Sequence, residues 1–273
     1  MAESEIDYVL TRDILDNNRL NLQHYLWIEL FQYHIHPSVA IDNSSVLRIA
    51  DVGTGTGIWL TDLARRLPCT AVMDGLDISL EAAPPAGCLP SNVAFYQYDI
   101  HSNAPDRLRG IYDIVHVRNF SLVLKNTQIE QAIRNLMQLL KPGGYLQWGE
   151  PDVSSLRIEQ TAPGTDISAL NELTELTLGM DARLRPTWVP SLPKLFETCG
   201  LGDVLTDIRD APPHLALANH ECNLVMHELI ARKTRSTAVG QRLAALMPQA
   251  MQETRAGAFW AFTRWTVVGR KAA

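Results

Sequence analysis

The sequence contains few cysteines, and their spacing predicts no metal site. Four cysteines occur among 273 residues, namely Cys69, Cys88, Cys199 and Cys222. None of them belongs to a C-x-x-C pair, which argues against a structural zinc site and against a disulfide framework. This pattern is typical of a protein in a reducing compartment, so the sequence predicts a cytoplasmic protein with no metal ligands.

The sequence also lacks blocks of basic residues and long apolar runs. Its 24 basic and 30 acidic residues give a net charge of −6, and the pI is about 5.7. Nucleic-acid binders usually carry a basic patch, so we expect no nucleic-acid partner. No apolar run approaches the ~18 residues of a membrane span. The first ten residues, MAESEIDYVL, are acidic and polar, and this composition predicts neither a secretory signal nor a transit peptide.

A glycine-rich turn is the most informative segment. The sequence DVGTGTGIW, at residues 51–59, follows a β-branched run at 46–52 and precedes apolar residues at helical spacing. A strand, a glycine turn and a helix in this order form the context of a nucleotide-binding turn, where missing Cβ atoms let the backbone approach a ligand. The dinucleotide pattern G-x-G-x-x-G is excluded, because Ile58 and Leu60 stand where its third glycine would fall.

Acidic residues follow the next two expected strands. Asp77 ends the strand expected at 71–76 and lies 20 residues after Gly57, where nucleotide-binding α/β units place a carboxylate on the ribose hydroxyls. We prefer Asp77 to Asp74, which falls inside the strand. Asp99 follows the strand expected at 93–98, and Asp99 and Ile100 are candidates for contacting an adenine ring. The alternative for Asp99 is a turn or helix-cap role.

The pattern as a whole predicts an α/β fold. The expected strands lie at 46–52, 71–76, 93–98, 111–117, 145–148, 203–209 and 259–269. Helical or loop crossovers between the first five strands are typical of a doubly wound parallel sheet. The last two strands are expected to pair at one edge. The prediction is a Rossmann-like, doubly wound, seven-stranded sheet that is mostly parallel, with an antiparallel last strand and helical lid segments.

Helical patterns on both sides of the core predict that the chain is divided into three parts. An amphipathic helix is expected from its N-cap at Thr11 to about His34, and a long helical region at about 219–256. We therefore expect an N-terminal lid helix at 1–45, a core at 46–150, and substrate-side helices with the last strands at 151–273. The extra apolar residues of the first helix indicate dense packing, a pocket wall or a homodimer contact.

Four segments stand in the order of the motifs of class I S-adenosylmethionine (SAM) methyltransferases. They are DVGTGTGIW at 51–59, GLDIS at 75–79, YDIVHVR at 112–118 and LKPGGYLQW at 140–148. With RLNLQH at 19–24, the wider pattern resembles the small-molecule methyltransferases of fungal secondary-metabolite pathways. The chain has no Asn/Asp-Pro-Pro-Tyr/Phe segment after the fourth strand, which counts against methylation of nucleic-acid bases. Residues 152–258 show nothing diagnostic.

The resemblance implies SAM as the cofactor and assigns roles to the matching positions. The glycine turn would hold the methionine end of SAM, and the strand-end acids would hold its nucleoside. The implied cofactor-binding residues are Asp51, Gly53, Thr54, Gly55 and Gly57 at the methionine end, Asp77 and Ile78 at the ribose, Asp99 and Ile100 at the adenine, Val117 and Arg118 beside the sulfonium, and Tyr8, Arg19 and Gln23 from the N-terminal segment.

Methyl transfer from a sulfonium depends mainly on the alignment of donor and acceptor. A hydroxyl acceptor also needs a base, for which histidine is the usual side chain near neutral pH, whereas a carboxylate acceptor needs none. His116, after the fourth strand, and His24, on the first helix, are the first candidates for a catalytic base. His214 and His227 come next. Glu150 is a further candidate, with a helix-cap role as its alternative.

The expected function is SAM-dependent methyl transfer to an oxygen, either hydroxyl or carboxylate, of an apolar small-molecule natural product. Two alternatives stay open. One is a SAM-binding pericyclase or cyclase that transfers no methyl group, and the other is a non-enzymatic regulator with a methyltransferase fold. The sequence does not identify the acceptor, because its pocket depends on how three helical segments fold over the sheet.

Overall fold

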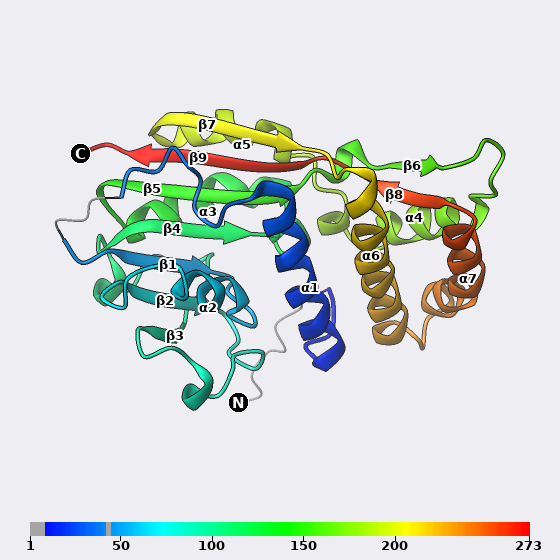
Figure 1. Ribbon diagram of the computed structural model, residues 1–273, viewed down its shortest axis with the longest axis horizontal. Helices are drawn as coiled ribbons and strands as arrows, with labels where there is room; N and C mark the ends of the chain where they lie inside the picture. The colour runs from blue at the N-terminus through cyan, green and yellow to red at the C-terminus, as the bar shows by residue number, and fades with distance from the viewer. Residues whose placement is uncertain (1–8, 42–44) are drawn as a thin grey trace.

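A seven-stranded sheet forms the centre of the computed structural model, which describes residues 9–41 and 45–273 (Figure 1). The strand order is β3-β2-β1-β4-β5-β9-β7, and β9 runs antiparallel to both of its neighbours, β5 and β7. The strands are β1 (Arg48–Val52), β2 (Val72–Asp77), β3 (Val93–Gln97), β4 (Tyr112–Arg118), β5 (Leu140–Pro151), β7 (Leu201–Arg209) and β9 (Arg264–Lys271). The predicted Rossmann-like sheet with an antiparallel last strand is confirmed.

Helices cover both faces of this sheet, because the strands are apolar on both faces. Neighbouring residues of β1, Ile49 and Ala50, belong to separate buried clusters, as the alternation of side chains along a strand requires. The helix α2 (Ile58–Ala64) packs in the cluster of Ile49, and α3 (Ile129–Leu139) and α5 (Leu192–Cys199) pack in the cluster of Ala50.

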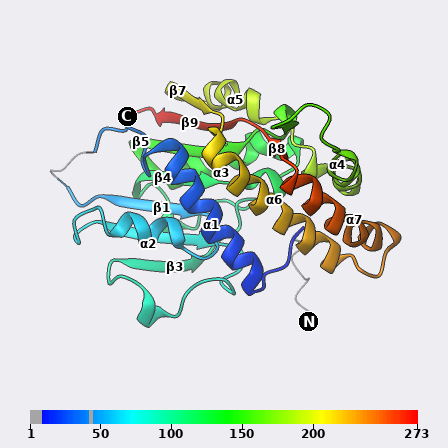
Figure 2. The same ribbon diagram turned by 45° about the vertical axis from the view of Figure 1, so that its right-hand side comes forward.

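A second group of helices lies beyond the carboxyl ends of β4 and β5 (Figure 1). It consists of α4 (Ser168–Met180), α6 (Pro213–Lys233), α7 (Ala238–Arg255) and a two-stranded sheet of β6 (Arg157–Gln160) and β8 (Ala258–Ala261). The N-terminal helix α1 (Ile14–Phe31) packs beside α6, as Figure 2 shows. This group has its own buried cluster, so the carboxyl end of the sheet faces a folded helical wall.

Two predicted elements are each divided in the structure. The helical region at 219–256 consists of α6 and α7, because the hydroxyl of Thr237 accepts a hydrogen bond from the backbone N–H of Gly240 and begins a new helix. The strand at 259–269 consists of β8 and β9, which lie in different sheets. The prediction was wrong here because alternation does not show which partner a strand pairs with.

The first helix is shorter than predicted. Its N-cap is Asp13, not Thr11, and the Asp13 carboxylate accepts hydrogen bonds from the backbone N–H groups of Leu15 and Asp16. The helix ends at Phe31, because Gln32 adopts a left-handed conformation with φ of 60°. Tyr8 lies outside the described residues. The three-part division of the chain and the homodimer contact stay predictions.

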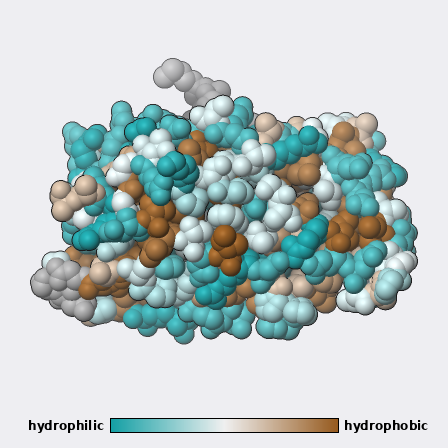
Figure 3. Space-filling view, turned by 90° about the horizontal axis from the view of Figure 1, so that it is seen from above, coloured by the Kyte–Doolittle hydropathy of each residue, from teal (hydrophilic) through white to brown (hydrophobic). Residues whose placement is uncertain are grey.

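The face of the molecule in Figure 3 is a mixture of hydrophilic and hydrophobic residues, with the hydrophobic ones in several separate clusters. Among the described residues, we find no helix with the length and apolar character that crossing a membrane requires.

Candidate functional site

Two cavities lie next to each other at the carboxyl ends of the central strands. The larger, of about 450 Å³, is lined by the glycine turn and by residues that follow β2, β3 and β4. The smaller, of about 110 Å³, is lined by residues of α1, α4, α6 and β8. Leu20 and Asn119 line both cavities. These two residues therefore mark the junction between the cavities.

The glycine turn owes its shape to left-handed backbone conformations and to close packing. Gly53, Gly55 and Gly57 have φ values of 71°, 53° and 69°. A Cβ on Gly53 would lie 2.3 Å from the ring of Phe120, and one on Gly57 would lie 2.3 Å from the ring of Phe95. Gly53 and Gly55 line the larger cavity, whereas Gly57 does not. In this structure Gly57 serves the packing of the turn.

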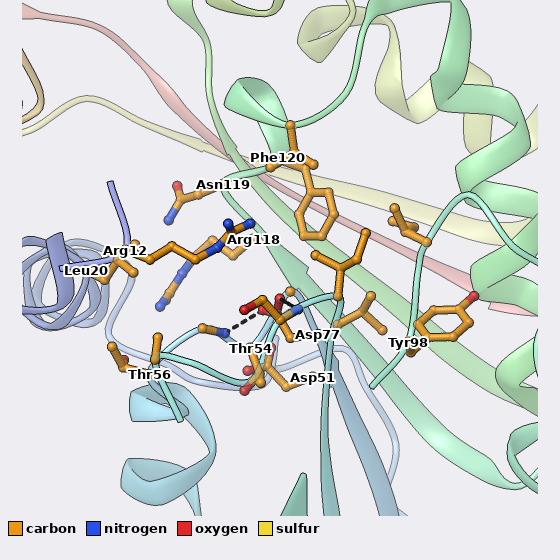
Figure 4. Close-up of a pocket in the computed structure, with 18 of the residues that line it drawn as sticks. Arg12, Leu20, Asp51, Thr54, Thr56, Asp77, Tyr98, Arg118, Asn119 and Phe120 are labelled. Atoms are coloured by element: carbon orange, nitrogen blue, oxygen red, sulfur yellow. Dashed lines mark hydrogen bonds between the residues drawn. The ribbon is translucent and has the colours of Figure 1, made fainter. Parts of the chain in front are cut away.

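Asp77 connects the end of β2 to the glycine turn (Figure 4). One carboxylate oxygen accepts a hydrogen bond of 2.9 Å from the backbone N–H of Gly55, and the other accepts one of 3.1 Å from Ser79. Burial raises the pKa of Asp77. The carboxylate is thus held in one orientation in the wall of the larger cavity, where its remaining lone pairs are suited to paired hydroxyl groups.

His116 fixes the orientation of Asp51. Its Nδ1 lies 2.7 Å from Asp51 Oδ1, and its ring stacks on Trp59 with centroids 3.8 Å apart. Because a carboxylate only accepts, Nδ1 carries the proton. Burial lowers the pKa of His116, so the ring is neutral near pH 7. His116 lines the larger cavity and not the smaller one, which favours an orienting role over the predicted role as base.

Arg118 lines the larger cavity and has one unpaired donor. One terminal nitrogen, Nη2, donates to Nδ1 of His24 over 3.1 Å, while Nη1 is buried and has no hydrogen-bond partner in the described part of the chain. Burial lowers the pKa of Arg118 to about 10, which leaves the guanidinium charged at neutral pH. A buried cation with a free N–H is a strong site for an anionic oxygen.

His24 lies behind Arg118, in a buried cluster. Its Nε2 donates to Asp62 over 3.1 Å, and His34 donates to the same oxygen over 2.7 Å. Burial lowers the pKa of His24 to about 3, so the ring is neutral. His24 lines neither cavity. Its place in the structure favours a role in orienting Arg118 over the predicted role as base.

Glu150 caps a short 3-10 helix, the alternative role considered from the sequence. Its carboxylate accepts hydrogen bonds from the backbone N–H groups of Phe120 and Ser121 and from the indole N–H of Trp148. The helix spans Phe120–Leu122 and positions the Phe120 ring against Gly53. Burial raises the pKa of Glu150 to about 7.

Most of the predicted cofactor-binding residues come together in one cavity. Val117 and Gly57 are buried outside its lining, and Arg19 and Gln23 line the smaller cavity instead. Arg19 and Gln23 lie on the α6 side of α1 and are joined by a hydrogen bond of 3.2 Å, whereas Leu20 also faces the larger cavity. Those that line the larger cavity are Asp51, Gly53, Thr54, Gly55, Asp77, Ile78, Asp99, Ile100 and Arg118.

Several residues at the cavities were given no role from the sequence, although Asn119 was expected near the ligand edge of the sheet. Arg12 and Leu20 enter from the N-terminal segment, and Asn119 and Phe120 follow β4 (Figure 4). Asn119 has a left-handed φ of 62°, which is uncommon outside glycine and frequent for asparagine. Its position directly after the fourth strand was the available signal. No local pattern indicates the approach of Arg12, because that depends on the packing of α1.

Comparisons with known proteins agree with this geometry. A family model described as methyltransferase domain matches residues 23–201. The sequence is 39% identical over 162 residues to the methyltransferase grgD of a Penicillium species, covering 57% of this chain and 55% of that protein. It is 28% identical over 217 residues to the N-methyltransferase gliN of Aspergillus fumigatus, covering 78% and 74%.

Two further similarities concern a regulator and a cyclase. The secondary metabolism regulator laeA of Gibberella zeae is 30% identical over 203 residues, which cover 72% of this chain and 61% of that protein. The crystal structure of the [4+2]-cyclase SpnF matches with a TM-score of 0.50 and 19% identity, covering 84% of this chain and 77% of that chain. The SpnF match shows a shared fold only.

The match to the family model spans more than half of the chain, although the chain spans about half the length of curated relatives such as grgD. The larger cavity fits SAM, because it combines a backbone without Cβ atoms, a fixed carboxylate at Asp77 and an unpaired guanidinium N–H at Arg118. The family match and the site agree, and the chain belongs to the methyltransferase domain family, whose cofactor is SAM.

Proposed function

We propose that this chain transfers the methyl group of SAM to a heteroatom of an apolar small molecule. The observation that carries the proposal is the junction of the two cavities at Leu20 and Asn119. A cavity with fixed carboxylates and a free guanidinium N–H suits a charged cofactor. A neighbouring cavity whose lining includes five leucines, Met226, Trp260 and Phe262 suits an apolar acceptor.

In the larger cavity, each charged end of SAM has a matching protein group. We assign the ammonium group to Asp51 and the carboxylate to Nη1 of Arg118, which is buried and unpaired among the described residues. The ribose hydroxyls are assigned to Asp77, and the adenine to Asp99 and Ile100. The neutral ring of His116 holds Asp51 in place without adding a charge of its own.

SAM supplies an activated methyl group on a sulfonium. The protein contributes alignment, since holding the reacting atoms at contact distance is worth roughly 7–11 kcal/mol of a bimolecular barrier. Leu20 and Asn119 are the residues placed to define this alignment, because each forms part of both cavity walls. Phe120 packs against Gly53 and closes the same side of the larger cavity.

Two kinds of atom on the small molecule are candidates for accepting the methyl group. An oxygen is the sequence-based expectation, and a nitrogen is a second candidate because relatives such as gliN and tcpN are named N-methyltransferases. A hydroxyl oxygen and an N–H nitrogen each lose a proton when they are methylated, whereas a carboxylate oxygen does not. A neutral histidine, His227, lines the smaller cavity and is the side chain best placed to receive that proton.

An assay with SAM labelled in its methyl group tests the proposal. The protein is incubated with labelled SAM and a panel of apolar phenols, amides and acids, and the products are identified by mass spectrometry and NMR. We expect label on oxygen or nitrogen of a product. Conversion of a panel member that requires SAM but leaves the label on SAM would favour a cyclase, and SAM binding without any conversion would favour a regulator.

A further inference from the structure

The smaller cavity has an apolar wall that is interrupted by a few polar atoms. Among the described residues, three of its lining side chains have buried polar atoms without a hydrogen-bond partner: Oδ1 of Asn119, Oγ1 of Thr177 and Nδ2 of Asn223. Thr177 is only 3% exposed. Buried polar groups are normally paired, so unpaired ones in a cavity wall indicate the positions of ligand groups.

His227 adds an acceptor to this wall. Its Nδ1 lies 2.9 Å from the backbone carbonyl of Asn223, and a carbonyl only accepts, so Nδ1 carries the proton. The ring stacks on Trp260 with centroids 4.5 Å apart, and no described residue pairs with Nε2. Burial lowers the pKa of His227 to about 4, which keeps the ring neutral near pH 7. Nε2 is therefore a bare acceptor in a ring that lines the cavity.

Asn119 adds a second acceptor at the junction with the cofactor cavity. Its left-handed backbone, with φ of 62°, turns the chain away from β4 and brings the side chain into both cavity walls. Oδ1 is the buried atom without a partner. A group on the acceptor molecule that donates to Oδ1 would lie next to the cofactor cavity.

We propose that Oδ1 of Asn119 and Nε2 of His227 make the smaller cavity selective for neutral acceptors that carry an N–H or O–H group, and that they reject carboxylates. The inference rests on the proposed function and narrows its substrate class. A carboxylate has only acceptor oxygens, so it would leave Oδ1 of Asn119 and Nε2 of His227 unpaired. Nδ2 of Asn223 and the hydroxyl of Thr177 can donate to it, but neither carries a charge that compensates a buried anion.

Two further features of the wall fit this selectivity. Arg19, the cationic side chain of the wall, lies 2.7 Å from Asp16, and both side chains are buried, so its charge is already compensated. The volume of about 110 Å³ is close to that of a cavity that holds a single benzene-sized ring. We therefore expect the acceptor to place one ring-sized group in the cavity.

Three one-ring probes test the inference without requiring turnover. The full chain is saturated with S-adenosylhomocysteine and titrated with phenol, toluene or sodium benzoate at neutral pH. Binding is followed by NMR through the labelled methyl group of Met226, a residue that lines only the smaller cavity. We expect phenol to bind at least tenfold more tightly than toluene, and benzoate to bind more weakly than toluene.

Variants assign this preference to the two side chains. His227→Phe keeps a ring against Trp260 and removes the acceptor, so phenol should bind no better than toluene. His227→Gln restores an acceptor and should recover most of the difference. Asn119→Gly tolerates the left-handed backbone but removes the acceptor, so it should weaken the binding of phenol. Asn119→Asp keeps an acceptor oxygen and should preserve the binding of phenol. His214, a candidate base from the sequence, is exposed on α6 and lines neither cavity, so His214→Phe is the matched control and should leave the binding of all three probes unchanged.

The outcomes separate the inference from the proposed function. If toluene and benzoate bind as tightly as phenol while Met226 responds to all three, the selectivity is wrong and the cavity is still an acceptor site. If no probe shifts Met226 although S-adenosylhomocysteine binds, both the acceptor role of the cavity and the inference are wrong. Circular dichroism melting shows whether each variant is folded. If His227→Phe unfolds, the binding of phenol relative to toluene in His227→Gln tests the inference instead.

Discussion

The two cavities differ in how their walls are made. The wall of the larger cavity comes mainly from short segments at the ends of β1, β2, β3 and β4, and backbone groups have a large part in it. The wall of the smaller cavity comes mainly from α1, α4, α6 and β8, which are far apart in the sequence, with further residues from the segments that follow β4 and β5. A cofactor that a whole family shares can be held by short segments at strand ends. A particular acceptor molecule must be matched by side chains from distant parts of the sequence. Under the proposed function, this difference assigns cofactor binding to the strand ends of the sheet and acceptor choice mainly to the helices.

A substitution in the glycine turn should have the largest effect, and only on the cofactor side. Gly53→Val adds atoms where a Cβ alone would lie 2.3 Å from Phe120, and it forces a β-branched residue into a φ of 71°. We expect SAM affinity to fall at least 100-fold, about 3 kcal/mol, by calorimetry. Gly87→Ala, whose Cβ would have no neighbour within 4 Å, is the control. Unchanged SAM affinity in a folded Gly53→Val protein would contradict the assigned site.

The pH dependence of stability tests the boundary between the cavities, where Glu150 holds the Phe120 helix. The pKa of Glu150 in the folded protein is about 7, above the ordinary glutamate pKa of 4.5, so the folded state binds more protons and stability falls as the pH rises through this range. Relative to Glu150→Gln, the free energy of unfolding should decrease by up to about 3 kcal/mol between pH 4 and 8. Parallel stability curves for the two proteins, measured by urea unfolding, would show that Glu150 does not titrate in this way.

Filling the smaller cavity should reduce the use of the methyl acceptor without reducing SAM affinity. Met226→Trp adds bulk to a residue that lines only the acceptor cavity. We expect the kcat/KM for the methyl acceptor to fall at least 30-fold, about 2 kcal/mol, while SAM affinity stays within twofold. Met251→Trp, at a position that is 45% exposed on α7, is the matched control. A loss of SAM affinity in the Met226 variant as large as the loss of kcat/KM would contradict the claim that the smaller cavity binds only the acceptor.

The smallest of these effects is expected for Asp77→Ala. The change removes the proposed ribose ligand and two hydrogen bonds, one from Gly55 in the glycine turn and one from Ser79, and SAM affinity should fall by more than about 1 kcal/mol. Calorimetry at neutral pH measures it, and Asp74→Asn, inside β2, is the comparison. Equal affinities for the Asp77 variant and the native protein would remove Asp77 from the site.

The same division explains what the sequence could predict. The glycine turn, Asp77 and Asp99 were found because each directly follows a strand, so local spacing places it at the ligand edge of the sheet. His24 was a candidate base because nothing local shows that Arg118 and Asp62 occupy both of its ring nitrogens. Asn119 and His227 lie 108 residues apart in the sequence, and they line one cavity because the fold places α6 beyond the carboxyl end of β4 (Figure 1). Contacts of this kind depend on tertiary packing, which a single sequence does not specify.

The position of the transferable methyl group tests the central claim most directly. The protein is labelled at Leu20 and Tyr98, which line the larger cavity, and bound to SAM with a ¹³C-labelled methyl group. Leu20 also lines the acceptor cavity, whereas Tyr98 does not. We predict nuclear Overhauser effects from the SAM methyl group to Leu20 and none to Tyr98. Effects to Tyr98 and none to Leu20 would place the methyl group away from the junction and contradict the account.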